Sequence, residues 1–429
     1  MSAALLAYGL ATRLLEPLAP ALLRRRASRG KEDHARLDER LGHPGLERPP
    51  GELVWLHGAS VGETLSLLPL IDRLRSERPD LALLVTSGTR TSAELLGRRL
   101  PEGVIHQYAP VDGPEAVSRF LDHWRPALGV FVESELWPNL LTKAKARGVK
   151  LALVSARVTD DTVRGWSRAR GLASRLLGGF DLILAQDIHS TIRLQQMGAH
   201  VAGEANLKLI GEPLPYDRAE FQRLSQAIGE RQVVLGASTH HGEDEHVISA
   251  VEMAAVGRPV LTILVPRHPD RAGEIASRQR AFRPRDPAPA RRSLGEPLTA
   301  DTRIYLADTL GELGLFLRLA DVVVMGGSFT TGIGGHNPLE AARLGKGVLH
   351  GDDLGNWSGV YSDLEFGGGS VRCGTEGELA QAIDRLLSDP VERARLNQAA
   401  AVVARRADAG IAPLMGRLAP LLPPMGSRR

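Results

Sequence analysis

Cysteine is almost absent from this chain of 429 residues, because Cys373 is its only thiol. A single cysteine cannot form an internal disulfide, and such sparse use is typical of proteins in a reducing compartment. The histidines also lack a compact zinc-ligand spacing. The sequence therefore excludes a disulfide-stapled scaffold, and its length allows two or three domains, each with its own hydrophobic core.

Common phosphate-binding and metal-binding motifs are missing too. The chain contains neither the Gly-x-Gly-x-x-Gly fingerprint of dinucleotide-binding folds nor the glycine-lysine loop of P-loop proteins. It contains no Asp-x-Asp pair, so a metal that assists the departure of a diphosphate has no obvious ligands. The formal net charge is only +3 and the pI is about 9.2. This charge fits an anionic partner but does not require nucleic acid.

An unbroken membrane-spanning run is absent from the N-terminus, although residues 2–23 are rich in leucine and alanine. A spanning helix needs about 20 mainly apolar residues, and this stretch is interrupted by Arg13, Glu16, Pro17 and Pro20. The basic cluster Arg24–Arg26 follows the apolar stretch, which argues against a cleaved signal peptide. Residues 1–30 are expected to lie on a membrane, to span it, or to dock on the protein itself. Each alternative leaves the body of the protein in the cytoplasm.

The central chain alternates short β-rich runs with helical patterns, which predicts an α/β fold with parallel sheets. The first predicted strands cover 53–57, 81–86, 129–132, 150–155 and 182–185. After a linker-like segment at 211–231, the pattern restarts at 232–236, 260–265, 303–306, 321–325 and 347–350. We therefore expect two Rossmann-like, doubly wound domains facing a central cleft, because such sheets bind ligands beyond the carboxyl ends of their strands. Residues 282–300 should form a surface loop, and residues 376–422 should be helical.

A glycine-rich loop follows the predicted strand 321–325 and opens into a short helix. The expected N-cap of that helix is Asn337, with Pro338 at the first helical position and Glu340 at the third. Free backbone N–H groups and the positive end of a helix dipole would meet there, which suits a phosphate. An acidic side chain on the first turn, here Glu340, can reach the hydroxyls of a sugar.

Polar side chains of the first half follow predicted strands or adjoin the linker. Glu63 ends a Ser-x-x-Glu spacing, which is typical of a helix cap but also suits a carboxylate that accepts a proton from an attacking hydroxyl. Glu133 and Glu135 follow another apolar strand, and burying both is costly unless one is paired, for example with Arg157 or Lys208. Lys208 fits either a solvated surface group or a cation that stabilises developing negative charge.

The second half adds three segments at predicted strand ends. The turn His240-His241-Gly242-Glu243 offers N–H groups to a phosphate more readily than it ligates a metal. Pro266-Arg267 suits an anionic ligand or an ion pair between domains. Leu310-Gly311-Glu312 precedes a helix, where it either caps that helix or contributes to a ligand site.

Taken together, several segments resemble the Kdo transferases, which are the 3-deoxy-D-manno-octulosonic acid transferases of lipopolysaccharide assembly. The matching segments, in the order of that family, are HGASVGE, VESELWPNL, ANLK, GASTHHGEDE, LVPRHPDR, DTLGELG and GGHNPLEAARLGKGVLHG. The resemblance implies a GT-B fold and inverting transfer of Kdo from CMP-Kdo to the lipid A precursor lipid IVA. It also implies a place at the cytoplasmic face of the cell inner membrane, and activity without a cofactor or a bound metal.

On this resemblance, Glu63 falls on the catalytic base, and Glu133 and Lys208 fall on positions that stabilise the transition state. The CMP-binding segments of the family correspond to Pro266-Arg267, Leu310-Gly311-Glu312 and Asn337-Pro338-Leu339-Glu340. The implied order is a membrane-associating segment (1–30), an acceptor domain (31–210), a linker (211–231), a CMP-sugar-binding domain (232–405) and a tail (406–429). The basic N-terminal region is expected to meet an anionic membrane surface. Nucleic acid is not an expected partner.

Some positions depart from the pattern of the family. Ser155 stands where asparagine is usual, Leu209-Ile210 replaces a Phe-Asp pair, and Asp352-Asp353 stands where Pro-His is frequent. The alternatives are a GT-B transferase or an epimerase that acts on another nucleotide sugar, and a catalytically inactive, membrane-associated binding protein. The simultaneous presence of Glu63, Lys208 and Glu340 argues against an inactive protein.

Overall fold

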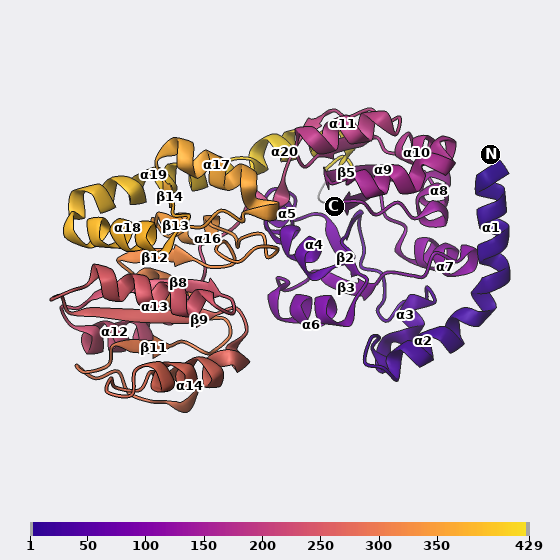
Figure 1. Cartoon of the computed structure of the whole chain (residues 1–429). Coiled ribbons are helices and arrows are strands. Elements are labelled where there is room, and N and C mark those ends of the chain that lie inside the picture. The colour runs from indigo at the N-terminus through magenta and orange to yellow at the C-terminus, as the bar shows by residue number, and fades with distance from the viewer. Residues whose placement is uncertain (1–2, 426–429) are drawn as a thin grey trace. The chain divides into compact units, whose positions relative to one another are not determined.

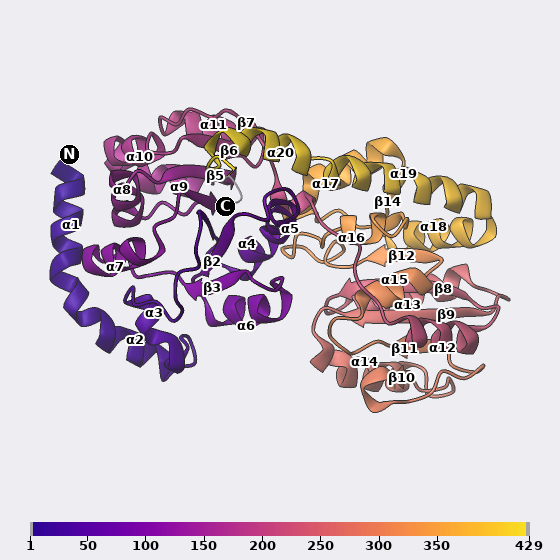
Figure 2. The ribbon, with the colours of Figure 1, turned by 180° about the vertical axis from the view of Figure 1, so that it is seen from behind.

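The computed structural model describes residues 3–425, and the chain divides into two compact units. Unit 1 comprises residues 1–211 and 408–429, and unit 2 comprises residues 212–407. The predicted N-terminal segment and tail include residues 1–2 and 426–429, which lie outside the described residues. Each unit is built on one parallel sheet with helices on both faces (Figures 1 and 2).

The sheet of unit 1 has the strand order β3-β2-β1-β4-β5-β6-β7. Its strands are β1 (Leu53–His57), β2 (Ala82–Ser87), β3 (Ile105–Tyr108), β4 (Leu128–Val132), β5 (Lys150–Ala156), β6 (Leu182–Ala185) and β7 (Gly203–Glu204). The order reverses between β1 and β4, which is the switch point where doubly wound sheets bind ligands. The sequence-based strands agree with five of these elements but miss β3 and β7, because β3 is polar and β7 spans only two residues.

Helices cover both faces of this sheet, because successive strand residues point to opposite sides. Leu53 and Trp55 pack with α7, α8, α10 and α11, whereas Val54 and Leu56 pack with α5, α6 and α20. The helices of unit 1 are α1 (Ala3–Leu15), α2 (Ala19–Ala27), α3 (Leu37–Arg40), α4 (Val61–Ser66), α5 (Leu68–Glu77), α6 (Arg90–Arg99), α7 (Pro114–Trp124), α8 (Pro138–Ala146), α9 (Asp160–Trp166), α10 (Arg170–Leu177), α11 (Ile188–Gln196) and α20 (Ile411–Leu418).

The N-terminal segment is broken at Glu16-Pro17 and docks on unit 1 through polar contacts. The Tyr8 hydroxyl donates to Asp112 at 2.9 Å, and the Asn139 amide donates to Thr12 at 2.9 Å. The Glu16 carboxylate accepts the backbone N–H groups of residues 115 and 116, at the start of α7. In Figures 1 and 2, α1 accordingly lies along α7 and α8. No helix within residues 3–425 is long and apolar enough to cross a membrane.

Unit 2 repeats the architecture with the strand order β10-β11-β9-β8-β12-β13-β14. Its strands are β8 (Gln232–Thr239), β9 (Val260–Pro266), β10 (Ala290–Arg291), β11 (Ile304–Leu306), β12 (Val322–Met325), β13 (Val348–His350) and β14 (Ser370–Arg372). Its helices are α12 (Arg218–Ile228), α13 (Glu243–Ala254), α14 (Ala272–Phe282), α15 (Leu313–Leu319), α16 (Leu339–Ala342), α17 (Ser358–Gly367), α18 (Glu376–Ser388) and α19 (Pro390–Asp408).

Two sequence-based expectations for this unit are wrong in part. The predicted linker at 211–231 contains α12, whose Leu224 and Ile228 are buried in the core of unit 2. The predicted surface loop at 282–300 contains β10, which pairs with β11 at the edge of the sheet. The apolar face of α12 is interspersed with charged residues and β10 spans only two residues, so composition alone suggested irregular structure.

Candidate functional site

Glu63 lies on the first turn of α4, directly after β1. Its backbone N–H donates to Ser60 Oγ at 3.3 Å, and the Ser60 hydroxyl donates to Glu63 Oε1 at 2.6 Å. The second carboxylate oxygen accepts the Ala59 N–H at 2.8 Å. A Cβ at Gly58 would lie 3.0 Å from Glu63 Cβ, so the turn passes the carboxylate closely because residue 58 has no side chain. The helix-cap contacts are therefore present, and the same carboxylate stands at the carboxyl end of a central strand.

Glu133 follows β4, the neighbour of β1, and pairs with Lys208. Lys208 Nζ lies 2.5 Å from Glu133 Oε1, with 31% of the lysine side chain and 17% of the glutamate side chain exposed. Glu133 adopts φ 60°, a left-handed conformation that is uncommon outside glycine. The ion pair that the sequence allowed between these two residues is thus present. The pair joins a carboxylate at the switch point to the cation of the segment Leu207–Leu209.

Glu135 belongs to a second polar group at the same edge, which the sequence did not reveal. His57 Nε2 lies 3.5 Å from Glu135 Oε2. Thr86 Oγ1 accepts the Trp55 indole N–H at 2.7 Å and lies 2.8 Å from His57 Nδ1. An indole N–H can only donate, so the Thr86 hydroxyl proton is free for Nδ1 of His57, and Nε2 of the same ring faces Glu135. Burial raises the pKa of Glu135, but its contacts with His57 and with the Trp137 indole hold that pKa below the ordinary value.

In unit 2, Arg267 and two histidines gather at the carboxyl ends of β9, β8 and β12. His240 Nε2 and His336 Nε2 lie 2.9 Å apart, and their rings stack with centroids 5.1 Å apart. Burial, followed by the neighbouring His240 and Arg267, lowers the pKa of His336 to about 4. Burial raises the pKa of Glu340, and Arg343 and Arg267 oppose that rise. Arg267 is exposed, so its guanidinium is accessible to an anion at this edge.

The glycine-rich loop after β12 offers fewer free N–H groups than the sequence suggested. The Glu243 carboxylate accepts the N–H groups of His240 at 2.9 Å, Gly327 at 2.7 Å and Phe329 at 2.9 Å. The Asp353 carboxylate accepts the N–H groups of residues 332 and 333. These two acidic side chains hold the loop and occupy positions that we expected a phosphate to fill. A phosphate here would therefore depend on side chains, chiefly Arg267.

Two further expectations need correction. The helix after this loop begins at Leu339 instead of Pro338, although Asn337 Oδ1 does accept the Leu339 N–H at 3.0 Å. The Glu312 carboxylate neither caps α15 nor faces solvent freely. It is bound by Arg292 and Thr309, and its pKa is lowered first by the Arg292 hydrogen bond. Within Leu310-Gly311-Glu312, the Glu312 carboxylate is thus already engaged by the protein, whereas Leu310 is 79% exposed.

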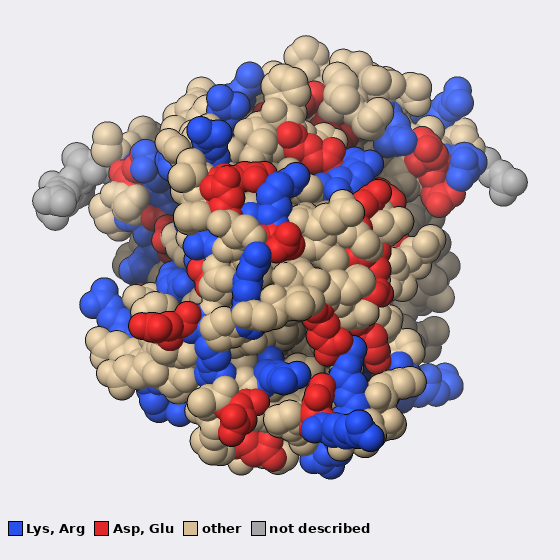
Figure 3. All heavy atoms as spheres, turned by 60° about the vertical axis from the view of Figure 1, so that its left-hand side comes forward, with Lys and Arg blue, Asp and Glu red and all other residues tan. Residues whose placement is uncertain are grey.

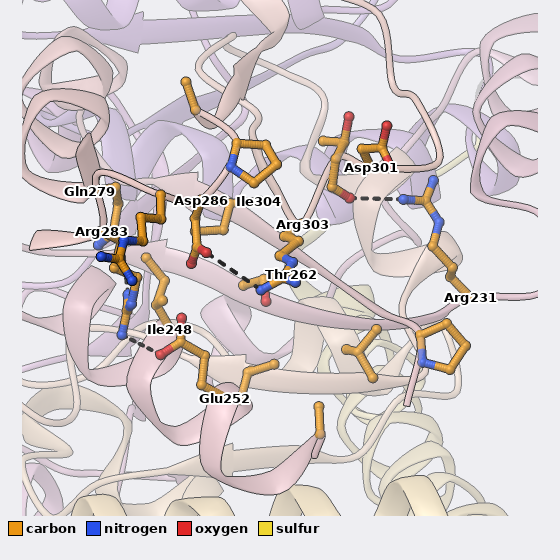
Figure 4. A pocket seen from close by; sticks show the side chains of 18 of the residues that line it. Arg231, Ile248, Glu252, Thr262, Gln279, Arg283, Asp286, Asp301, Arg303 and Ile304 are labelled. Carbon is orange, nitrogen blue, oxygen red and sulfur yellow. Dashed lines mark hydrogen bonds and ion pairs between the residues drawn. The ribbon is translucent and has the colours of Figure 1, made fainter. Parts of the chain in front are cut away.

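A hollow of about 1150 Å³ lies at the opposite, amino-terminal edge of the sheet of unit 2. It is lined by the starts of β9 and β11 and by several arginines (Figure 4). Arg283 pairs with Glu252, and Arg303 lies 3.8 Å from Asp286. The hollow therefore satisfies much of its own charge. Figure 3 shows basic and acidic side chains intermixed on the face that it draws, without the basic stripe of a nucleic-acid footprint among the described residues visible there.

Residues 3–425 contain no group of three or more histidine, cysteine or acidic side chains arranged to hold a metal ion. Within each unit, the predicted site residues do come together at the carboxyl edge of one sheet. They are Glu63, Glu133 and Lys208 in unit 1, and Pro266, Arg267, Leu310, Gly311, Glu312, Asn337, Pro338, Leu339 and Glu340 in unit 2.

Comparisons with known proteins identify relatives of this chain. Residues 35–210 match the family profile described as 3-deoxy-D-manno-octulosonic-acid transferase (kdotransferase). A 3-deoxy-D-manno-octulosonic acid transferase of Bordetella pertussis is 35% identical over 410 residues, which cover 92% of this chain and 94% of that protein. A probable mitochondrial 3-deoxy-D-manno-octulosonic acid transferase of Arabidopsis thaliana is 35% identical over 88% of this chain and 86% of its own. A glycosyltransferase structure from Rickettsia africae shares the fold, with a TM-score of 0.58 and 10% identity over 87% of this chain and 99% of that one.

Proposed function

Because this chain belongs to the 3-deoxy-D-manno-octulosonic acid (Kdo) transferase family and is a Kdo glycosyltransferase of lipopolysaccharide biosynthesis, we propose that its donor is CMP-Kdo and its acceptor is lipid IVA. One observation carries the proposal. Glu63 and the Lys208–Glu133 pair stand at the switch point of unit 1, where a doubly wound sheet binds its ligand.

In the proposed reaction, Glu63 is the general base. Its carboxylate removes the proton of a glucosamine 6-hydroxyl of the acceptor, and the oxygen attacks the anomeric carbon of Kdo. The bond from that carbon to the phosphate oxygen breaks, CMP leaves with the electron pair, and the configuration inverts. The Lys208 cation, held by Glu133 at 2.5 Å, stabilises negative charge that develops in the transition state.

The donor is assigned to the carboxyl edge of unit 2. Arg267 supplies a permanent positive charge for the phosphate of CMP, since the planar guanidinium presents a fork of donors that matches phosphate. We assign to Glu340 the hydrogen bonds from the ribose hydroxyls. Because Glu243 and Asp353 already bind N–H groups of the loop, we assign the neutralisation of the leaving phosphate to side chains, and the family resemblance adds the expectation that no metal or other cofactor takes part.

Attachment to the cytoplasmic face of the inner membrane is also part of the proposal. Leu6, Leu10, Leu14, Leu18 and Leu22 recur every fourth residue, and each is at least 46% exposed. Docking of α1 uses Tyr8, Thr12 and Glu16, so this leucine row remains available to lipid. The cluster Arg24-Arg25-Arg26 ends α2 and suits anionic headgroups.

Vesicle flotation tests the membrane assignment. Leu10→Asp combined with Leu14→Asp should reduce binding to vesicles that contain anionic lipid at least about tenfold. Two leucine side chains that become buried in the lipid contribute several kcal/mol to binding. Leu46→Asp is a matched control, since Leu46 is an exposed leucine of the same unit outside the row. Equal binding of the double variant and the control would exclude the leucine row as the anchor.

The transfer itself is tested with purified protein, CMP-Kdo generated in the reaction mixture, and lipid IVA, with and without EDTA. Mass spectrometry of the lipid should show a gain of whole Kdo units that EDTA does not diminish. A parallel reaction with a UDP-sugar should give no product. Absence of a Kdo product from folded protein that binds CMP would overturn the choice of acceptor, and failure to bind CMP would overturn the choice of donor.

A further inference from the structure

Ser155 stands between the two segments that carry the Lys208–Glu133 pair. It is 2% exposed and lies near the end of β5. Its hydroxyl oxygen accepts the backbone N–H of Leu207, the residue before Lys208, at 2.7 Å. On its other side, Val154 and Arg157 bracket Glu133. The Glu133 N–H donates to Val154 O at 3.4 Å, and the Arg157 N–H donates to Glu133 O at 3.4 Å.

The backbone at Ser155 is unusual in the same place. Its φ is 53°, a left-handed conformation that serine seldom adopts, and Glu133 beside it has φ 60°. The pairing of β5 with β6 shifts register between Leu153 and Ala156. Bulges of this kind re-aim side chains next to active sites, and paired strain of this kind persists where surrounding contacts enforce it. The bulge turns the Ser155 hydroxyl toward the segment that carries Lys208.

We propose that Ser155 is the positioning residue of the Lys208–Glu133 pair, fixing the lysine through its hydroxyl and the glutamate through its left-handed backbone. The proposal rests on the roles given above to Glu133 and Lys208. Leu207 is fully buried, and the Asn206 side chain accepts the Lys208 N–H at 3.1 Å. Because Ser155 also holds Leu207, the backbone of Lys208 has a defined position, from which the flexible lysine side chain reaches Glu133. Ser155 itself touches no substrate in this account.

Three substitutions test the contribution of the Ser155 hydroxyl. Ser155→Ala removes the hydroxyl oxygen that accepts the Leu207 N–H. Ser155→Gly removes the same oxygen, and glycine adopts the left-handed backbone without strain. Both should lower kcat between about tenfold and a hundredfold, because small misplacements of a catalytic group have effects of this size. The KM for CMP-Kdo should stay within about twofold, since the donor is assigned to unit 2. Ser155→Asn retains a side-chain oxygen and favours this conformation, so it should restore most of kcat.

A double-mutant cycle decides whether Ser155 acts through Lys208. In the Lys208→Met background, Ser155→Ala should cause no further loss of kcat, because the cation that it positions is gone. Ser118→Ala is the matched control. The Ser118 hydroxyl accepts a hydrogen bond from Lys143 Nζ and donates one to Pro114 O, but it lies in the middle of α7. This control should leave kcat unchanged.

Amide hydrogen exchange tests the proposal without any assumption about the acceptor substrate. Peptides that span residues 203–211 should exchange faster in Ser155→Ala than in the unaltered protein, and Ser155→Asn should restore their protection. Unchanged exchange, or additive losses of kcat in the cycle, would overturn the positioning role even if Lys208 is essential. Full activity of Lys208→Met would instead refute the role proposed for Lys208, and the positioning role with it.

Discussion

Lys208 Nζ lies 2.5 Å from Glu133 Oε1, and this contact links a segment after β7 to the end of β4. The pair is partly exposed, and partly exposed ion pairs contribute at most about 1 kcal/mol to stability. Lys208→Met should therefore change the free energy of unfolding little. It should lower kcat about a hundredfold or more, because it removes a cation that stabilises the transition state.

The comparison for that variant is Lys145→Met. Lys145 forms an equally short ion pair with Asp181, at 2.5 Å, on the surface of the same unit. Steady-state kinetics and thermal unfolding of both variants should show equal small losses of stability but a loss of kcat only for Lys208→Met. Similar kcat values for the two variants would make the Lys208–Glu133 pair a surface ion pair and nothing more.

Arg267 and Arg280 distinguish the two edges of unit 2 as donor sites. Arg267 lies at the end of β9, and Arg280 lines the hollow at the amino-terminal edge. Arg267→Ala should weaken CMP binding by about tenfold to a hundredfold, as expected for a lost charge-assisted hydrogen bond. Arg280→Ala should leave the Kd of CMP unchanged. Isothermal titration with CMP checks both, and the reverse pattern would move the donor to the hollow.

Asp112 makes the stability of unit 1 depend on pH. Burial raises its pKa to about 6, although N–H groups at the start of α8 and the Tyr8 hydroxyl oppose that rise. A raised carboxyl pKa means that the folded state binds the proton more tightly than the unfolded state. The resulting stability is fully present below about pH 4 and is lost as the pH rises through about 6.

Asp112→Asn removes this titration while keeping the shape of the side chain. The difference in Tm between the unaltered protein and the variant should therefore shift in favour of the variant as the pH rises from 4 to 7. The change corresponds to about 3 kcal/mol at most, from a shift of about two pKa units. A difference in Tm that stays constant across this pH range would show that Asp112 does not titrate as described.

Glu243 and Asp353 hold the glycine-rich loop in different ways, which predicts different tolerance to amides. Both oxygens of Glu243 accept N–H groups, so Glu243→Gln presents an NH₂ group to at least one of them. One oxygen of Asp353 accepts both of its N–H groups, so Asp353→Asn can keep them. Glu243→Gln should destabilise the protein by about 1–3 kcal/mol, as expected for an unsatisfied buried donor.

Thermal unfolding and CMP titration of the two amide variants check this prediction. Asp353→Asn should resemble the unaltered protein in both measurements, whereas Glu243→Gln should lower the Tm and weaken CMP binding. Equal behaviour of the two variants would mean that the loop does not depend on how its N–H groups are shared.

Most strands were predictable because a parallel sheet that is buried on both faces leaves continuous apolar runs in the sequence, such as Leu53–His57. The positions of Glu63, Glu133 and Arg267 at strand ends followed from those runs. The partners of loop N–H groups did not, since Glu243 reaches residues 327 and 329 across more than 80 positions of sequence. The left-handed backbone conformations of Glu133 and Ser155 were not predictable either, because neither glutamate nor serine favours a positive φ.

Glu63 carries the central claim, and kcat of Glu63→Gln for Kdo transfer tests it most directly. The amide keeps an oxygen for the Ala59 N–H or the Ser60 hydroxyl, so the helix start should survive while the base is lost. The account predicts that kcat falls by a factor of about 10²–10⁴ while the Kd of CMP is unchanged. A kcat within about threefold of the unaltered protein would contradict it and leave Glu63 as a helix cap.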